Sequence, residues 1–400
     1  MKHLSLLAAF ALFCQAQAAD QPVSPGEHKK QSCAIAEQTF DLFLPKAYAD
    51  KPEKKFPVVY LSSPNKNPGF HQLQAWAEKN EVVLITINES QNGEWGPIFT
   101  AQDAVWEGTS YLRLHPNLRF AIGFSGAGLA GLELAKRKDQ QFAGVLLHSH
   151  SGVDTNGDVP EVPKHLAFAF ISGEKDQTHP SKWTRYSSRI LEKSHYVQAH
   201  FVPDMGHEWR DGALQEQCLS NLLQYAWLTH PALTAAERQT HLVAFGKRLE
   251  TLDGKSPPQE RLALTDPLFA CSQLRQEPIW QQGVDVWCAA EAEVLSAAGT
   301  GLAAFKLAMD PKTAARLKLA KSAQEAVATA VKPILGNPEL RAEIAAYHLY
   351  AVQANQERKD RVNSSWNAAD CKKAYEQLAA SHPGTWAAEL ANAAALRLSN

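Results

Sequence analysis

The residues best suited to chemistry in this sequence surround one serine. An apolar run, residues 120–122, leads into residues 123–127 (Gly-Phe-Ser-Gly-Ala), and a segment of helical character follows. A sharp strand-to-helix turn of this kind presents a serine hydroxyl above the edge of a sheet, and small neighbours let the turn pack closely. The helix start also directs backbone N–H groups at developing negative charge. We therefore predict Ser125 as a nucleophile and the N–H of Gly126 as an oxyanion donor; a glycine-rich turn with an incidental serine is the alternative.

Two later segments supply candidate partners for this serine. A predicted strand, residues 167–171, is followed by Ser-Gly-Glu-Lys-Asp, which ends at Asp176, and the last predicted strand, residues 197–202, is followed by Pro-Asp-Met-Gly-His, which ends at His207. A serine nucleophile needs a base to take its proton and an acid to orient that base. After a turn of this kind the partners follow in the order acid, histidine. We predict Asp176 as the acid and His207 as the base. Glu174 is the alternative acid, and an aspartate that only stabilises a turn is the alternative interpretation of Asp176.

These motifs resemble a known superfamily. Gly-x-x-Asp after the penultimate strand and Gly-His after the last are similar to α/β-hydrolase esterases, and residues 205–209 (Met-Gly-His-Glu-Trp) resemble secreted esterases of the polyhydroxybutyrate-depolymerase and feruloyl-esterase type. The resemblance covers about residues 35–229. It implies a Ser125–His207–Asp176 triad that hydrolyses carboxylic esters through an acyl-enzyme, with no metal or organic cofactor. The implied partner is a small or polymeric ester.

The sequence departs from that family at one position. Family members carry His-Gly after the first long strand, and the loop there supplies a second oxyanion donor; residues 61–65 of this chain are Leu-Ser-Ser-Pro-Asn. Pro64 has no N–H, so we predict the backbone N–H of Ser63 as the second donor. Loss of one such donor typically lowers the rate by about 10²–10³. A non-catalytic binding protein on a hydrolase frame therefore remains an alternative, as does a serine peptidase.

Four ring-bearing residues are predicted to line the substrate site. Phe124 precedes the nucleophile, His148 ends the next predicted strand, and Trp209 lies two residues after the predicted base. Trp95 and Trp209 are suited to an aromatic acyl pocket. Ordinary buried packing is the alternative for the two tryptophans, and a histidine held by local hydrogen bonds is the alternative for His148.

The elements that must position these residues alternate between strands and helices. The apolar runs are continuous rather than alternating, which favours parallel strands buried on both faces. We predict a doubly wound, mostly parallel sheet of the α/β class, the α/β-hydrolase fold. Its predicted strands are residues 56–61, 82–87, 120–122, 144–147, 167–171 and 197–202, and its predicted helices are residues 71–80, 101–114, 126–138 and 181–193.

The texture of the sequence changes after residue 230. Thr234 and Glu237 form a capping box, Asp310 and Asn337 each precede a proline at a helix start, and residues 367–378 predict a further helix. We predict a smaller all-helical domain over residues 231–400, available to a protein partner. Residues 374–391 resemble the end of a tetratricopeptide-type hairpin, and a helical cap without repeats is the alternative.

The N-terminus and the bulk composition set the remaining expectations. Lys2, an apolar run at residues 4–13 and Ala-Gln-Ala at 16–18 predict a secretory signal peptide, residues 1–18, and a periplasmic or secreted protein whose hydrolase domain covers residues 19–230. Forty basic and 42 acidic residues give no reason to expect nucleic acid as partner. No later stretch predicts a membrane span. Because exported proteins can form disulfides, Cys271 and Cys288, which are closest in sequence, are the favoured pair.

Overall fold

The computed structural model describes residues 24–34, 37–93, 95–138, 141–153, 158–159, 161–209, 212–252, 256–271, 274–310, 313, 324–362 and 367–398. The predicted signal peptide lies outside these residues. Contacts divide the chain into an α/β unit, Met1–Thr251 with Asp266–Ile279, and a helical unit, Leu252–Thr265 with Trp280–Asn400. The expected boundary at residue 231 concerns independent folding and stays a prediction.

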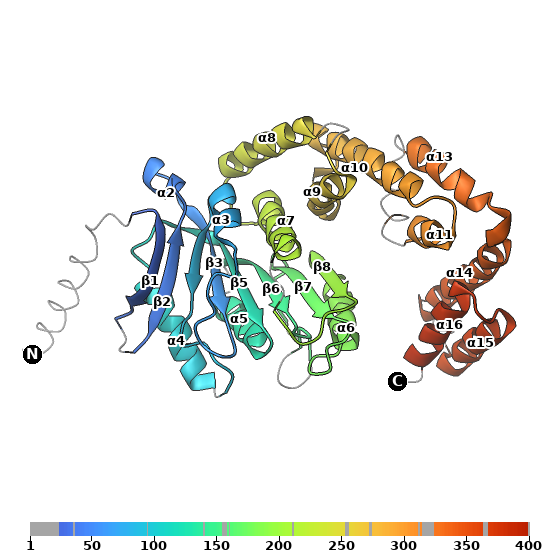
Figure 1. Ribbon diagram of the computed structural model, residues 1–400, viewed down its shortest axis with the longest axis horizontal. Coiled ribbons are helices and arrows are strands. Elements are labelled where there is room, and N and C mark those ends of the chain that lie inside the picture. The colour runs from blue at the N-terminus through green and yellow to red at the C-terminus, as the bar shows by residue number, and fades with distance from the viewer. Residues whose placement is uncertain are drawn as a thin grey trace, which may run out of the picture. The chain divides into compact units, whose positions relative to one another are not determined.

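One eight-stranded sheet organises the α/β unit, and its strands run in the spatial order β1-β2-β4-β3-β5-β6-β7-β8 (Figure 1). β2 pairs antiparallel with β1 and β4, and every later pairing is parallel. The prediction of a mostly parallel sheet is confirmed. The strands are β1 (Gly26–Ser32), β2 (Thr39–Leu44), β3 (Phe56–Ser62), β4 (Val83–Thr86), β5 (Leu114–Phe124), β6 (Phe142–His148), β7 (Ala167–Gly173) and β8 (Val197–Val202).

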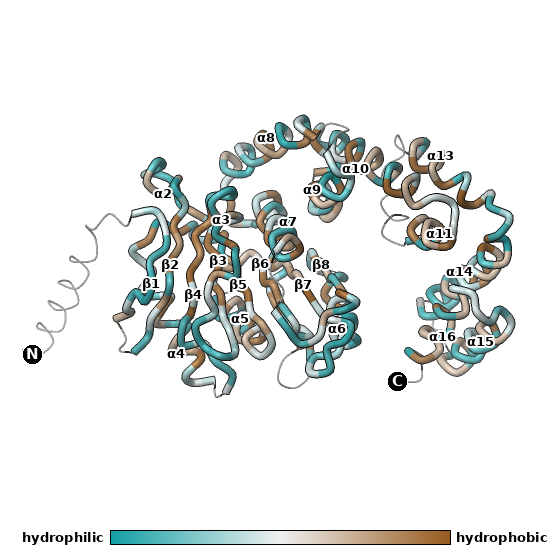
Figure 2. The backbone as a smooth tube through the Cα atoms, viewed as in Figure 1, coloured by the Kyte–Doolittle hydropathy of each residue, from teal (hydrophilic) through white to brown (hydrophobic). Residues whose placement is uncertain are grey.

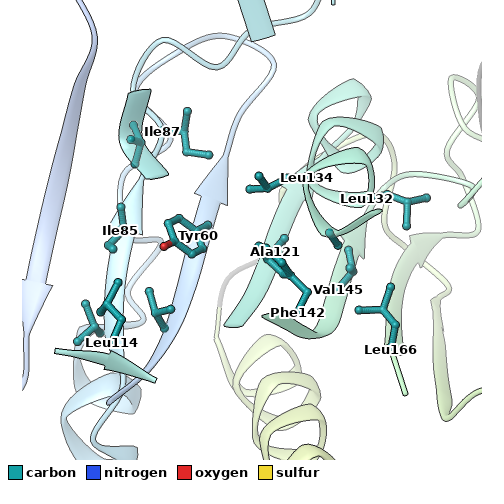
Figure 3. Packing of buried hydrophobic residues seen from close by; sticks show 14 of the residues in the cluster. Tyr60, Ile85, Ile87, Leu114, Ala121, Leu132, Leu134, Phe142, Val145 and Leu166 are labelled. Atoms are coloured by element: carbon teal, nitrogen blue, oxygen red, sulfur yellow. The ribbon is translucent and has the colours of Figure 1, made fainter. Parts of the chain in front are cut away.

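The continuous apolar runs make strands that are buried on both faces. Successive side chains of a strand point to opposite faces: in β3, Val58 and Tyr60 enter one hydrophobic cluster, whereas Val59 and Leu61 enter the other. Figure 3 shows the first cluster, where Tyr60 lies among apolar side chains from neighbouring elements. Full burial of one such side chain stabilises the fold by about 1.5–3 kcal/mol. Figure 2 shows the contrast with edge strand β1, which is hydrophilic along its length.

Helices cover both faces of this sheet. Helices α4, α5 and α6 pack on the cluster that holds Tyr60, and α3 and α7 pack on the cluster that holds Leu61. Helix α4 ends earlier than expected, because the chain turns at residues 109–112 and enters β5. The helices of this unit are α2 (Ala47–Asp50), α3 (Gln74–Asn80), α4 (Trp95–Gly108), α5 (Gly126–Arg137), α6 (Ser181–Leu191), α7 (Ala213–Thr229) and α8 (Ala235–Thr251).

The remaining chain is helical where it is described, as predicted. The elements are α9 (Pro258–Ala270), α10 (Pro278–Ala297), α11 (Leu302–Ala308), α13 (Gln324–Leu335), the 3-10 helix η4 (Pro338–Leu340), α14 (Arg341–Val362), α15 (Ala368–Ser381) and α16 (Trp386–Arg397). Two capping predictions are confirmed: Thr234 and Glu237 exchange hydrogen bonds at the start of α8, and the Asn337 side chain accepts from the Glu339 N–H at the start of η4. The predicted helix at residues 367–378 is α15, and the helix start predicted at Pro311 lies outside the described residues. No described helix is long and apolar enough to cross a membrane.

A buried carboxylate joins the last three helices. Glu357 of α14 accepts hydrogen bonds from the Tyr375 hydroxyl of α15 at 2.8 Å and from the Arg397 guanidinium of α16 at 2.6 Å. Arg361, one turn along α14, donates to the same carboxylate at 3.0 Å. Two positive groups and one hydroxyl therefore satisfy the only buried charge of this three-helix contact among the described residues.

The five described cysteines are free thiols, so the expected Cys271–Cys288 disulfide is wrong. The Cys271 thiol donates to the Pro267 carbonyl at 3.1 Å, in the last turn of α9. Burial raises the pKa of the Cys288 thiol to about 12, which keeps it protonated and unreactive at neutral pH.

Candidate active site

The turn between β5 and α5 is strained at Ser125. This residue has φ 53° and ψ −133°, a conformation that side chains other than glycine rarely adopt. Its N–H donates to the His148 carbonyl on neighbouring β6 at 2.9 Å. Two glycines make the turn possible: a Cβ at Gly123 would lie 2.0 Å from the Ala127 carbonyl oxygen, and one at Gly128 would lie 2.8 Å from the His150 Cβ. The small residues around the serine are therefore required by close packing.

Three side chains from the ends of three strands meet at this turn. The Ser125 hydroxyl lies 2.9 Å from Nε2 of His207, which follows β8. The other ring nitrogen of His207, Nδ1, lies 2.9 Å from Oδ2 of Asp176, which follows β7. Ser125 is 7 % exposed and Asp176 4 % exposed, whereas the His207 side chain is 25 % exposed. The hydroxyl can donate to Nε2 while Nδ1–H donates to the carboxylate, which is the arrangement that activates a serine.

Asp176 is fixed by its own loop. Its Oδ1 accepts from the backbone N–H groups of Thr178 at 2.9 Å and His179 at 2.8 Å, which leaves Oδ2 for His207. Glu174 points elsewhere, because its carboxylate accepts from Ser181 and Arg185 at the start of α6. Of the two acids considered from sequence, it is Asp176 that contacts the histidine.

The loops that carry the acid and the histidine pack against each other. Lys175 N–H donates to the Met205 carbonyl at 3.0 Å. A Cβ at Gly173 would lie 2.2 Å from that same carbonyl oxygen, so glycine is required where the two loops meet. This contact sets the spacing between Asp176 and His207 through the backbone.

The start of α5, where the oxyanion donors are predicted, contacts one residue that was not predicted from the sequence. Gly126 is the first residue of α5, so its N–H has no acceptor within the helix. Ser62 pairs in register with Gly123, so Ser63 follows directly at the adjacent strand end. The missed residue is Asn92, whose carboxamide oxygen lies 2.1 Å from the position that a Cβ on Gly126 would take. An asparagine in an irregular loop belongs to no repeating hydrophobic pattern that would reveal its contacts in the sequence. The glycine at position 126 is the one sequence feature that indicates a close neighbour there.

The predicted ring-bearing residues divide into two groups. Phe124 lies beside His207, with ring centroids 5.1 Å apart, and His148 stacks on Trp209 at 5.0 Å. Phe124 and Trp209 also meet edge to face at 5.7 Å, so these rings form one aromatic group next to the triad. Trp95 is not part of it: its ring contact among the described residues is with Phe99, one turn along α4.

Two further histidine rings, His150 and His179, lie near His207. The His179 ring is 5.4 Å from the His207 ring and 5.1 Å from the His150 ring. Burial, with a smaller effect of His179, lowers the pKa of His150 to about 3. Burial likewise lowers the pKa of His179, where His207 adds to the effect and Asp176 opposes it. Both rings are therefore neutral at pH 7 and add no positive charge beside the triad.

The sheet order, the antiparallel β2, and the placement of Ser125 after β5, Asp176 after β7 and His207 after β8 define the α/β-hydrolase fold. No three His, Cys, Asp or Glu side chains gather as a metal site among the described residues.

Comparison with known proteins adds structural likenesses at low identity. No family model and no curated protein matches the sequence. A solved ferulic acid esterase is 15% identical, with a TM-score of 0.41, and the match covers 50% of this chain and 99% of that one. The carboxylesterase of Bacillus cereus is 15% identical, with a TM-score of 0.34, over 44% of this chain and 90% of that one. An S-formylglutathione hydrolase of Staphylococcus aureus is 12% identical, with a TM-score of 0.35, over 47% of this chain and 92% of that one.

Proposed function

We propose that this protein is an exported serine esterase that hydrolyses carboxylic esters through an acyl-enzyme. The observation that carries the proposal is the unbroken hydrogen-bonded series from buried Asp176 through His207 to Ser125 at a strained turn. Strained backbone and a buried, fully partnered carboxylate are costly features that a purely structural turn does not need.

The chemistry follows from the positions of these atoms. Ser125 Oγ attacks the ester carbonyl carbon while His207 Nε2 takes the hydroxyl proton. The carbonyl oxygen becomes an oxyanion in front of the Gly126 N–H. When the intermediate collapses, the C–O bond to the alcohol breaks and His207 returns its proton to the leaving alcohol. A water then attacks the acyl-enzyme with His207 again as base, which releases the acid and restores Ser125.

The test is hydrolysis by the purified chain that begins at residue 19. We expect turnover of short acyl and phenolic aryl esters, with none by Ser125→Ala. A parallel panel of peptide amides separates an esterase from a serine peptidase. Hydrolysis of peptide amides without esters would move the assignment to a peptidase, and a folded protein that turns over neither would contradict the proposal.

Export is the second part of the proposal, and it rests on the residues at positions 2–18. In a secreting bacterial host the mature chain is expected to begin at or near Ala19 and to leave the cytoplasm. N-terminal sequencing of the protein from that host checks it. Recovery of an intact Met1 would contradict export without affecting the esterase assignment.

A further inference from the structure

Two loops beside Ser125 are hydrogen-bonded to each other. One follows β3, where the resemblance places the second oxyanion donor, and the other follows β4. An isolated antiparallel bridge joins Asn65 to Gln91. The backbone bonds that connect the loops are Lys66 N–H to Ser90 O at 2.9 Å, Asn67 N–H to Asn88 O at 2.7 Å and Asn92 N–H to Pro64 O at 2.8 Å. The last bond ties Asn92 to the loop in which the family carries its donor.

This connection brings the Asn92 side chain onto the first residue of α5. A Cβ at Gly126 would lie 2.1 Å from Asn92 Oδ1 and 3.1 Å from Nδ2, so the carboxamide occupies the space beside the Gly126 Cα that a larger side chain would take. Asn92 is exposed, and its carboxamide makes no hydrogen bond with another described residue. The carboxamide therefore lies against the first residue of α5, with its N–H donors available among the described residues.

The loop after β3 is poor in donors at this point. Pro64 has no N–H, and its carbonyl already accepts from Asn92. Ser63 retains a backbone N–H at that strand end. A tetrahedral intermediate is best stabilised by two or more donors fixed before the reaction, and a carboxamide NH₂ supplies two.

We propose that Asn92 is a catalytic residue whose Nδ2 donates a hydrogen bond to the oxyanion, beside the Gly126 N–H. The inference rests on the proposed esterase function and extends it. The amide oxygen is the atom nearer to Gly126. A half-turn about the last side-chain bond exchanges it with the nearly isosteric NH₂ group, and the oxyanion favours that exchange because it repels Oδ1 and attracts N–H.

Kinetics of three single variants test this role. Asn92→Ala removes the donor and Asn92→Asp replaces it with a carboxylate that cannot donate at neutral pH. Asn65→Ala is the matched control: it removes an exposed asparagine side chain from the facing loop and keeps the backbone bridge to Gln91. Because a side-chain oxyanion donor acts in the transition state, Asn92→Ala should lower kcat by about 10²-fold with little change in KM.

A second readout separates catalysis from structure. A trifluoromethyl ketone forms a serine-bound oxyanion, so its affinity should fall in both Asn92 variants by the same factor as kcat. Affinity for the carboxylate product, which has no oxyanion of this geometry, should stay within about twofold for Asn92→Ala. Asn92→Asp should be at least as impaired as Asn92→Ala, and Asn65→Ala should match the parent chain.

The outcomes distinguish this inference from the proposed function. An active parent chain in which Asn92→Ala keeps full kcat and full ketone affinity overturns the role of Asn92 and leaves the esterase assignment intact. Equal loss in Asn65→Ala and Asn92→Ala overturns it too, because the loops rather than the carboxamide would then matter. A parent chain that neither hydrolyses esters nor binds the ketone overturns both proposals.

Discussion

Two buried carboxylates, one in each unit, have opposite surroundings. Asp176 in the α/β unit is held by two backbone N–H groups and turns its remaining oxygen to a histidine that reaches Ser125. Glu357 in the helical unit is surrounded by fixed cations and a phenol from α14, α15 and α16. Burial acts to raise the pKa of Glu357, but the Tyr375 hydrogen bond and the two guanidinium groups outweigh it and lower the pKa.

The two carboxylates therefore differ in what their partners contact. The partners of Glu357 are two guanidinium groups and a phenol, so this carboxylate joins three helices and contacts no histidine or nucleophile among these partners. The partner of Asp176 is a histidine, a side chain suited to accept a proton from a hydroxyl, and that histidine contacts the hydroxyl of Ser125. We therefore expect loss of Asp176 to affect rate and loss of Glu357 to affect stability.

The largest expected effect is on turnover by Asp176→Asn. The amide keeps the shape but can no longer stabilise the imidazolium or fix the histidine tautomer, so kcat should fall by on the order of 10⁴. Steady-state ester hydrolysis measures it. Glu174→Gln is the matched control, because Glu174 accepts from Ser181 and Arg185 instead of His207. If Glu174→Gln lost as much rate and Asp176→Asn stayed near normal, the two acids would have to exchange roles.

A smaller effect, in the other observable, is expected from Glu357→Gln. It leaves two guanidinium groups without their carboxylate, but both arginines are about half exposed and water screens them. The free energy of unfolding of the helical unit should fall by about 1–3 kcal/mol, with ester kcat unchanged. Chemical denaturation followed by circular dichroism measures it. Glu376→Gln, whose carboxylate lies 3.8 Å from Lys372 at the surface, should change stability little. A large loss of kcat in a stable Glu357→Gln variant would contradict a purely structural role for Glu357.

The smallest expected effect is the contribution of buried His150 to the pH dependence of stability. His150 is buried as the neutral form, and its pKa of about 3 in the folded chain lies below its unfolded value of 6.5. As pH falls from 6.5 towards 3 the unfolded chain binds a proton that the folded chain does not, so stability falls with acidification. One such group contributes a slope of about 1.4 kcal/mol per pH unit near pH 5. His150→Asn should reduce the slope of unfolding free energy against pH by that amount, and an unchanged slope would show that His150 is protonated in the fold.

Much of the α/β fold follows from the sequence because burial on both faces leaves a continuous apolar run. β8 matches its predicted range, and β3 and β7 extend theirs by one or two residues. β1 and β2 were not predicted. β1 is a polar edge strand with partly exposed residues, and β2 alternates between buried and half-buried positions. Such patterns are weaker, because an edge strand is defined by its neighbour's hydrogen bonds and not by its own side chains.

The site could be predicted where it depends on strand ends and not where it depends on loop shape. Ser125, Asp176 and His207 each follow a strand of the parallel part of the sheet, which brings those strand ends to one edge. Trp95 begins α4 and stacks on Phe99, and its place at the substrate site stays a prediction. Asn92 reaches Gly126 only through the bonds between two irregular loops. Contacts made by irregular loops follow no repeating hydrophobic pattern, so the sequence does not reveal them.

Reaction of Ser125 with a fluorophosphonate probe tests the central claim most directly. Such a probe labels a serine only when its hydroxyl is activated by a base and oxyanion donors are close. We expect rapid labelling of the parent chain, none in Ser125→Ala, and labelling slowed by orders of magnitude in His207→Ala. The double variant should differ little from Ser125→Ala, because triad members act as a unit. A folded parent chain that takes no label and hydrolyses no ester would contradict the account and make this molecule a binding protein on a hydrolase frame.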